Sequence, residues 1–182
     1  MHGAGNDYVY VNCFAEQLPR PAAELAIEIS DRRFGVGGDG LILIEPSQVA
    51  DARMRMFNAD GSEAEMCGNG IRCVAKYVYD HGISRREHLA IETGNGVRQL
   101  VLELEHDKVS RVTVDMGEPK LVAADVPTTL SSEPVINFET QFAGVTLKVT
   151  TVSMGNPHCV IFVPHATDEL VLGLGPKIEC DP

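Results

Sequence analysis

Residues 57–73 read FNADGSEAEMCGNGIRC, and this stretch holds a strand end, a turn and a helix start in succession. Residues 53–57, which lead into it, alternate charged and apolar side chains and so indicate a half-buried strand. Residues 58–62 consist mostly of the residue types that favour turns. Apolar residues then recur at helical spacing over 71–79, and Gly82 supplies a helix stop.

The start of this predicted helix is also where chemistry is expected. Cys67 stands directly before Gly68, Asn69 and Gly70. Glycines let a ligand approach the backbone closely, and a helix N-terminus favours a carboxylate or phosphate. The same field favours the thiolate form of a cysteine. The stretch therefore predicts a site that holds an amino acid with its α-carbon beside the sulfur; the alternative for Cys67 is a small side chain packed in the core.

The rest of the chain is rich in strands. Strands are predicted at 8–11, 41–44, 89–92, 97–105, 110–116, 135–138, 145–152 and 158–163, and helices at 21–33 and 166–174, the latter ended by Gly175-Pro176. Strands and helices do not alternate regularly, so the predicted fold class is α+β and not a doubly wound parallel sheet.

Composition and net charge exclude several classes of protein. The chain has 182 residues, 44% of them hydrophobic and 23% charged, which is typical of a globular protein. The net charge of −11 argues against a nucleic-acid or anionic-membrane surface. No basic and apolar leader follows Met1, and no apolar run is long enough to span a bilayer. We expect a cytoplasmic protein.

The five cysteines are expected to be free thiols. They are Cys13, Cys67, Cys73, Cys159 and Cys180, an odd number in a chain without an export signal. No pair has C-x-x-C spacing, so no zinc site or other metal site is expected. Cys73 is expected in the helix core, Cys13 and Cys159 are expected to be structural, and Cys180 lies in a terminal segment.

Two further patterns deserve an interpretation. The loop 35–40, GVGGDG, lacks the Lys-Ser/Thr of a phosphate-binding P-loop and lies between a helix and a strand, so it is interpreted as a turn.

Gly5-Asn6 and Gly155-Asn156 both precede a short apolar strand, and chance and internal duplication are both compatible with so short a match. If duplication is correct, a counterpart of Cys67 is expected about 150 residues further on, beyond these 182 residues.

The chain resembles the diaminopimelate epimerase family. The matching segments are 1–7 (MHGAGND), 33–37 (RFGVG), 57–73, 114–119 (VDMGEP) and 153–160 (SMGNPHCV). They are spread over nearly the whole chain, and the segment 57–73 is long and specific. The resemblance implies two pseudo-symmetric domains, each a central helix wrapped by mostly antiparallel β-sheet. The first would comprise residues 1–117 and the second, incomplete here, would begin with 118–182.

The resemblance also implies an enzyme of lysine and cell-wall precursor biosynthesis that interconverts LL- and meso-2,6-diaminopimelate without a cofactor. Two cysteines would face opposite sides of the α-carbon, and Cys67 matches the one that removes the proton. Gly68 and Asn69 match backbone contacts to the substrate carboxylate. The side chains that match other substrate contacts are those of Asn6, Asn58 and Asn156. His158 matches an auxiliary residue near the reacting centre, and the family's members commonly form homodimers.

Several family features are missing from the chain. The second catalytic cysteine, expected in a Cys-Gly-Thr-Gly segment, is absent, and Cys180 does not match it because Asp181 and Pro182 follow. Some family members have a substrate-binding Gln where this chain has Gly40. We therefore expect this chain to be part of a longer epimerase and to be inactive alone. The alternatives are a racemase of another amino acid, similar to proline racemase, and a non-catalytic half-protein that binds a ligand or partner.

Overall fold

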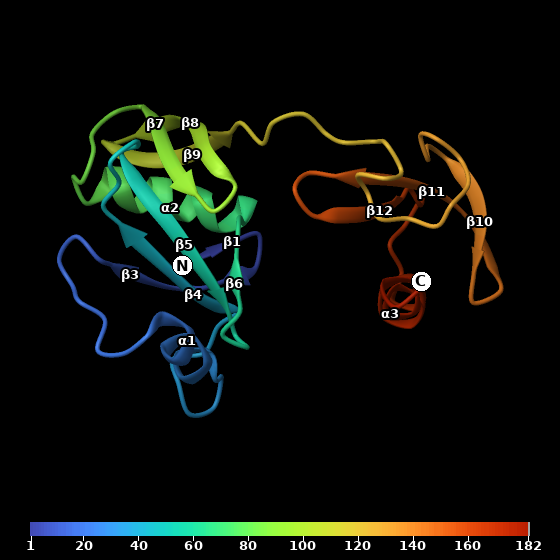
Figure 1. Ribbon diagram of the computed structural model, residues 1–182, viewed down its shortest axis with the longest axis horizontal. Coiled ribbons are helices and arrows are strands. Elements are labelled where there is room, and N and C mark those ends of the chain that lie inside the picture. Colours follow the sequence, from blue (N-terminus) through green and yellow to red (C-terminus); the bar gives the residue numbers. More distant parts are fainter. Residues whose placement is uncertain (182) are drawn as a thin grey trace. The chain divides into compact units, whose positions relative to one another are not determined.

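The computed structural model describes residues 1–181. The chain forms two compact units, the first comprising Met1–Met116 and the second starting at Gly117 (Figure 1). Both units combine helices with sheets, which confirms the predicted α+β class. No helix among the described residues is long and apolar enough to cross a membrane.

The first unit is built on a seven-stranded sheet. In spatial order its strands are β3 (Val9–Asn12), β4 (Gly40–Glu45), β5 (Ala52–Asn58), β7 (His88–Thr93), β8 (Gly96–Glu105) and β9 (Lys108–Val114), with β6 (Glu63–Ala64) paired to β5. The pairs β3–β4 and β5–β7 are parallel and the others are antiparallel. A separate hairpin joins β1 (His2–Gly3) to β2 (Asn6–Asp7).

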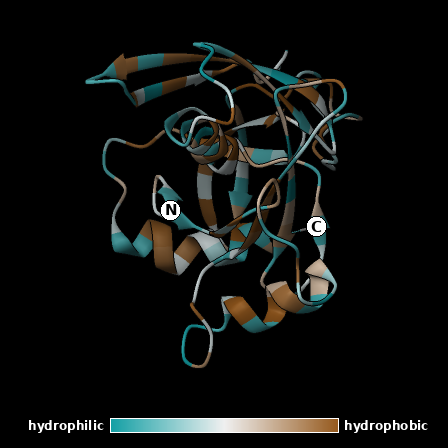
Figure 2. Cartoon of the chain, turned by 90° about the vertical axis from the view of Figure 1, so that its left-hand side faces the viewer, coloured by the Kyte–Doolittle hydropathy of each residue, from teal (hydrophilic) through white to brown (hydrophobic). Residues whose placement is uncertain are grey.

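Two helices cover opposite faces of this sheet. α2 (Gly68–Asp80) buries Ile71, Val74 and Val78 against one face, in a core that includes Ile42 and other alternate residues of β4 and β5. α1 (Ala22–Ser30) packs on the other face, against the intervening residues of the same strands. Figure 2 shows the resulting alternation of hydrophobic and hydrophilic colours along helices and strands. Because both of its faces are covered, β4 is a continuous apolar run, as its sequence predicts.

The helix predicted at 21–33 ends early, at Ser30. Asp31 leaves the helical conformation, and its Oδ1 accepts the backbone N–H groups of Arg33 and Phe34 at 2.7 and 2.8 Å. An aspartate that binds the following backbone in this way competes with helix continuation. The prediction was wrong at this end because Arg33, four residues after Ile29, falls at helical spacing but lies beyond the end of the helix.

The second unit contains the three-stranded antiparallel sheet β10 (Phe138–Phe142), β11 (Val145–Ser153) and β12 (Pro157–Ile161). The strand predicted at 135–138 is absent, and β10 begins only at Phe138. Asn137 has a positive φ of 51°, which breaks the extended conformation before it. Val135 is nevertheless fully buried, and its carbonyl accepts the N–H of Thr151 at 3.0 Å. Its apolar character reflects burial in a loop.

The last helical segment continues past its predicted end. A π-helical turn, η1 (Glu169–Leu174), leads directly into α3 (Gly175–Glu179), so Gly175-Pro176 does not end the helix. The N–H of Gly175 bonds to the carbonyl of Leu170, and Pro176 lies in the first turn of α3. A proline is tolerated there because its missing N–H would have no partner inside the helix.

Candidate active site

The thiol of Cys67 lies at the N-terminus of α2. Cys67 is the N-cap residue in extended conformation, and its Sγ accepts the backbone N–H of Gly70 at 3.3 Å. The first N–H groups of a helix have no acceptor within the helix, so those of Gly68 and Asn69 point outward from α2 beside the sulfur. Cys67 thus stands at the start of a helix, as predicted, and anion binding there stays a prediction.

The surroundings of Gly70 and Gly68 leave different amounts of space for a side chain. A Cβ on Gly70 would lie 2.7 Å from Ile42 Cδ1, in the core under the helix. A Cβ on Gly68 would meet only Met116, at 3.5 Å or more. The backbone of Gly68 is thus approachable, whereas that of Gly70 is closed by the sheet.

The N-terminal hairpin places Asn6 beside Cys67. The turn between β1 and β2 uses the positive φ angles of Ala4 and Gly5, 53° and 88°. Gly3 lies so close to the start of α2 that an added Cβ would be 2.8 Å from the carbonyl oxygen of Asn69. Cys67 Sγ then donates to Asn6 Oδ1 at 3.4 Å. Two of the predicted site residues, far apart in sequence, are therefore in direct contact.

Asn69 and Asn58 have partners of their own. Asn69 Oδ1 accepts from the Arg72 guanidinium at 2.6 Å, and Arg72 also donates to the carbonyl of Gly68 at 2.9 Å. Asn58 Nδ2 donates to Ser62 Oγ at 3.0 Å in the turn after β5. Arg72 thus braces the first turn of α2, and the Asn58 side chain is held within its own turn.

The buried Tyr8 and the half-buried Tyr10 lie near the cysteines of this unit. Burial raises the pKa of Tyr8, and the nearby Cys67 raises it further. Burial also raises the pKa of Tyr10, with Cys73 as the next contribution. Both phenols therefore stay neutral near neutral pH and add no negative charge to the site. Cys73 is buried in α2, as predicted.

Asp39 is a functional candidate that the sequence did not reveal. It lies in the loop before β4, and its Oδ2 accepts from Asn6 Nδ2 at 2.6 Å. The signal available in the sequence was an acidic residue between glycines, which is common in turns. Gly40, next to it, has no room for a side chain, because a Cβ there would be 2.1 Å from the Phe57 carbonyl oxygen.

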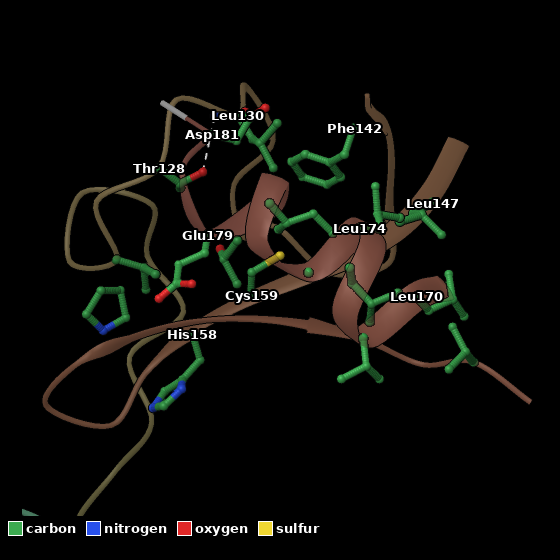
Figure 3. A pocket seen from close by; sticks show the side chains of 18 of the residues that line it. Thr128, Leu130, Phe142, Leu147, His158, Cys159, Leu170, Leu174, Glu179 and Asp181 are labelled. Atoms are coloured by element: carbon green, nitrogen blue, oxygen red, sulfur yellow. Dashed lines mark hydrogen bonds between the residues drawn. The ribbon is translucent and has the colours of Figure 1, made fainter. Parts of the chain in front are cut away.

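Asn156 and His158 belong to the second unit. His158 Nε2 lies 3.1 Å from Asn156 Oδ1, and both residues are exposed. Cys159, the next residue of β12, is exposed but contributes to a cavity of about 660 Å³ that Leu170, Leu174 and Phe142 also line (Figure 3). Its side chain and that of His158 lie on opposite sides of the strand.

Comparisons with known proteins identify the same family that the sequence resembles. The family model described as diaminopimelate epimerase matches residues 1–122. A diaminopimelate epimerase of Agathobacter rectalis is 51% identical, over 98% of this chain and 65% of the relative. One of Acetivibrio thermocellus is 49% identical, over 100% of this chain and 65% of the relative. The chain thus spans about 65% of the length of these curated relatives.

Solved structures of related fold are more distant in sequence. A hydroxyproline epimerase from Agrobacterium vitis superposes with a TM-score of 0.58 at 15% identity, covering 95% of this chain and 51% of that one. A methylitaconate-delta-isomerase gives a TM-score of 0.56 at 15% identity, covering 98% and 57%. At this identity the likeness concerns the fold alone, and it agrees with the expected architecture.

Proposed function

Because the chain belongs to the diaminopimelate epimerase family, we propose that it supplies the first catalytic cysteine of an enzyme that interconverts LL- and meso-2,6-diaminopimelate. The observation that carries the proposal is the position of the Cys67 sulfur, next to the outward N–H groups at the start of α2. Its relatives at 51% and 49% identity bear that name. Because the chain spans about 65% of the length of these relatives, the activity is proposed for a protein of their full length.

In the proposed reaction Cys67 acts as the base. Its thiolate takes the α-hydrogen as a proton, and the electron pair of the broken C–H bond remains on the substrate as a carbanion. A thiol on the opposite face then donates a proton to the same carbon, which inverts its configuration. That second thiol is proposed to come from the part of the protein beyond these residues.

The start of α2 is proposed to stabilise the carbanion. An α-proton of an amino acid is weakly acidic, so the charge that develops must be stabilised as it forms. Part of that charge moves onto the substrate carboxylate, where the N–H groups of Gly68 and Asn69 would donate to it. Donors fixed by a helix need no reorganisation during the reaction, and Arg72 holds this first turn in place.

The other predicted contacts remain part of the proposal. Asn6 and Asn58 in the first unit and Asn156 in the second would bind the substrate's polar groups, with His158 near the reacting centre. We propose that the second unit begins the second, pseudo-symmetric domain, with the predicted boundary at residue 117. In the first unit β3 is followed by α1, and in the second β12 is followed by the helical segment η1–α3, which supports this duplication.

Proton exchange with solvent tests the function. The complete protein is incubated with LL-diaminopimelate in D2O, and α-deuterium in each isomer is measured by mass spectrometry. We expect deuterium in both isomers, and a loss of about 10²–10⁴-fold in the Cys67→Ala variant, the usual contribution of a general base. Absence of α-deuterium from both isomers would refute the proposal.

Cys13→Ala is the matched control. Cys13 packs against the hydrophobic cluster on the α1 side of the sheet, whereas Cys67 packs against the cluster on the α2 side. The Cys13→Ala variant should therefore exchange the α-hydrogen at a rate within about twofold of that of the unmodified protein. The 182-residue chain provides a second comparison, because one thiol cannot serve both faces of the α-carbon. Inversion by this chain alone would contradict the two-thiol mechanism, and exchange with proline in place of diaminopimelate would redirect the substrate assignment.

A further inference from the structure

Asn6 lies between the Cys67 sulfur and the Asp39 carboxylate. Its Oδ1 accepts from Cys67 Sγ at 3.4 Å, and its Nδ2 donates to Asp39 Oδ2 at 2.6 Å. A single amide thus connects the thiol to a charged group that does not touch the sulfur itself. The three side chains come from the β1–β2 hairpin, the loop before β4 and the start of α2.

The chemistry of these groups permits one orientation of the amide. An ionised carboxylate can only accept hydrogen bonds, and an amide has a donor end and an acceptor end. If the Asn6 amide turned over, its oxygen would face an oxygen of Asp39 at hydrogen-bond distance, which is repulsive. Asp39 therefore directs the Asn6 oxygen toward Cys67.

Asp39 is itself held in place by other donors. Its Oδ2 also accepts the backbone N–H of Asp7 at 3.0 Å, and its Oδ1 accepts from Arg32 at 3.0 Å. Arg32 also binds the Asp7 carboxylate, at 2.7 and 3.1 Å, and this hydrogen bonding lowers the pKa of Asp7. A guanidinium that bridges two carboxylates fixes both of them geometrically.

We propose that Asp39 is a positioning residue, which holds the Asn6 amide so that its oxygen, and not its NH2 group, faces the Cys67 sulfur. The inference rests on the proposed function for its catalytic meaning. Two hydrogen bonds act on the sulfur in opposite senses: the Gly70 N–H favours the thiolate, whereas the Asn6 oxygen favours the thiol. Asp39 influences only the hydrogen bond between Cys67 and the Asn6 oxygen, because it contacts Asn6.

Other charged and titratable groups near the sulfur do not supply this effect. Tyr8 and Tyr10 stay neutral because their pKa values are raised, and Tyr8, which also hydrogen-bonds the Asn6 side chain, adds no charge there. Arg72, on α2, is engaged with the Gly68 carbonyl and Asn69. The carboxylates of Asp39 and Asp7 remain, and only Asp39 contacts the side chain of Asn6. A comparison of variants at these two acids therefore separates amide orientation from the loss of a nearby charge.

The test is the alkylation of Cys67 by iodoacetamide in the 182-residue chain, measured by peptide mass spectrometry across a pH series. In Asp39→Asn the amide is free to turn its donor toward the sulfur. We expect Cys67 to react about two- to tenfold faster at neutral pH, the range set by one hydrogen bond, with its pH midpoint moved down. In Asp7→Asn we expect a smaller change, and Cys159 in the second unit should be unaffected in both variants.

A double-variant comparison identifies the route through Asn6. If Asp39 acts through the amide, Asp39→Asn should change the rate by less than twofold in an Asn6→Ala background. The inference is overturned if Asp39→Asn leaves Cys67 unchanged, if Asp7→Asn matches it, or if the full effect persists without the Asn6 amide. None of these measurements requires epimerase activity, so failure here is distinct from failure of the proposed function.

Buried Cys73 reports whether the variants fold, because its alkylation requires the first unit to open. If Asp39→Asn proves unfolded by this criterion, the unmodified chain gives the answer by NMR. The side-chain NH2 protons of Asn6, assigned by their loss in Asn6→Ala, should exchange with water at least tenfold more slowly than those of exposed Asn95. Equal exchange rates would overturn the inference.

Discussion

Replacement of Gly40 by alanine should destabilise the first unit through a collision with the backbone. Gly40 is the first residue of β4 and pairs with Asn58 of β5. An added Cβ would lie 2.1 Å from the Phe57 carbonyl oxygen and 2.8 Å from Tyr8 Cε1. Because the nearest atom belongs to a buried strand, the change requires β4 and β5 to separate at this end.

The expected magnitude has two contributions. Overpacking of a well-packed interior costs about 1–3 kcal/mol. The φ of Gly40 is +158°, which residues with a side chain rarely adopt, and such a conformation costs about 1–3 kcal/mol more. We expect the free energy of unfolding to fall by about 3 kcal/mol or more, and the urea midpoint of the first unit to fall by about 1–2 M.

Tyrosine fluorescence during urea unfolding is a suitable assay. The chain has four tyrosines and no tryptophan, and Tyr8, Tyr10, Tyr77 and Tyr79 all belong to the first unit. Gly96→Ala is the matched control: Gly96 also has a positive φ, 85°, but nothing lies within 4 Å of its added Cβ. The control should lose about 1–2 kcal/mol, from backbone strain alone. Equal midpoints for the two variants would refute the collision argument.

Further predictions concern the same unit and the same urea assay. Gly40→Gln should unfold at least as early as Gly40→Ala, because the glutamine found at this position in some family members has no room for its Cβ here; greater stability would contradict this. Ser30→Ala should raise stability by about 0.5–1 kcal/mol, since within residues 1–181 the buried Ser30 hydroxyl has no hydrogen-bond partner; a loss would show that water satisfies it. Burial opposes the ionisation of Asp80, but the Val109 N–H and Lys76 outweigh it and lower the pKa of Asp80. Asp80 thus stabilises the fold above the ordinary carboxyl pKa of about 4, and this contribution disappears as the pH falls through its lowered value. Asp80→Asn should therefore be less stable than the unmodified chain at pH 7, and the difference should shrink as the pH falls below the ordinary carboxyl pKa of about 4; a difference that does not change with pH would contradict the assignment.

Much of the fold could be predicted where local pattern and tertiary burial agree. The run at 41–44 predicted a buried strand because both faces of β4 are covered by helices. The helix at 71–79 was found because its apolar spacing is the face that packs on the sheet. The predicted strand at 135–138 failed because Val135 is buried as part of a loop, which leaves no periodic signal.

Some residues of the candidate site could likewise be predicted from the sequence, and others could not. Cys67 and the helix start were recognisable because an N-terminus, glycines and a cysteine are adjacent in sequence. Asp39 was not recognisable, because its contact with Asn6 joins residues 33 positions apart, one in the β1–β2 hairpin and one in the loop before β4. No local pattern distinguishes an aspartate that orients a distant amide from one that completes a turn.

The sequence by itself determined the α+β class, the family and the position of Cys67 at the start of a helix, since these depend on spacing along the chain. Only the tertiary structure decided that Asn6 turns its oxygen to the Cys67 sulfur, that Asp39 and Arg32 hold it there, and that Gly40 admits no side chain. These last features depend on distances between strands and loops that meet only when the sheet is assembled. Hydrogen bonds and steric contacts act over a few ångströms, so they exist only after the fold brings their partners together.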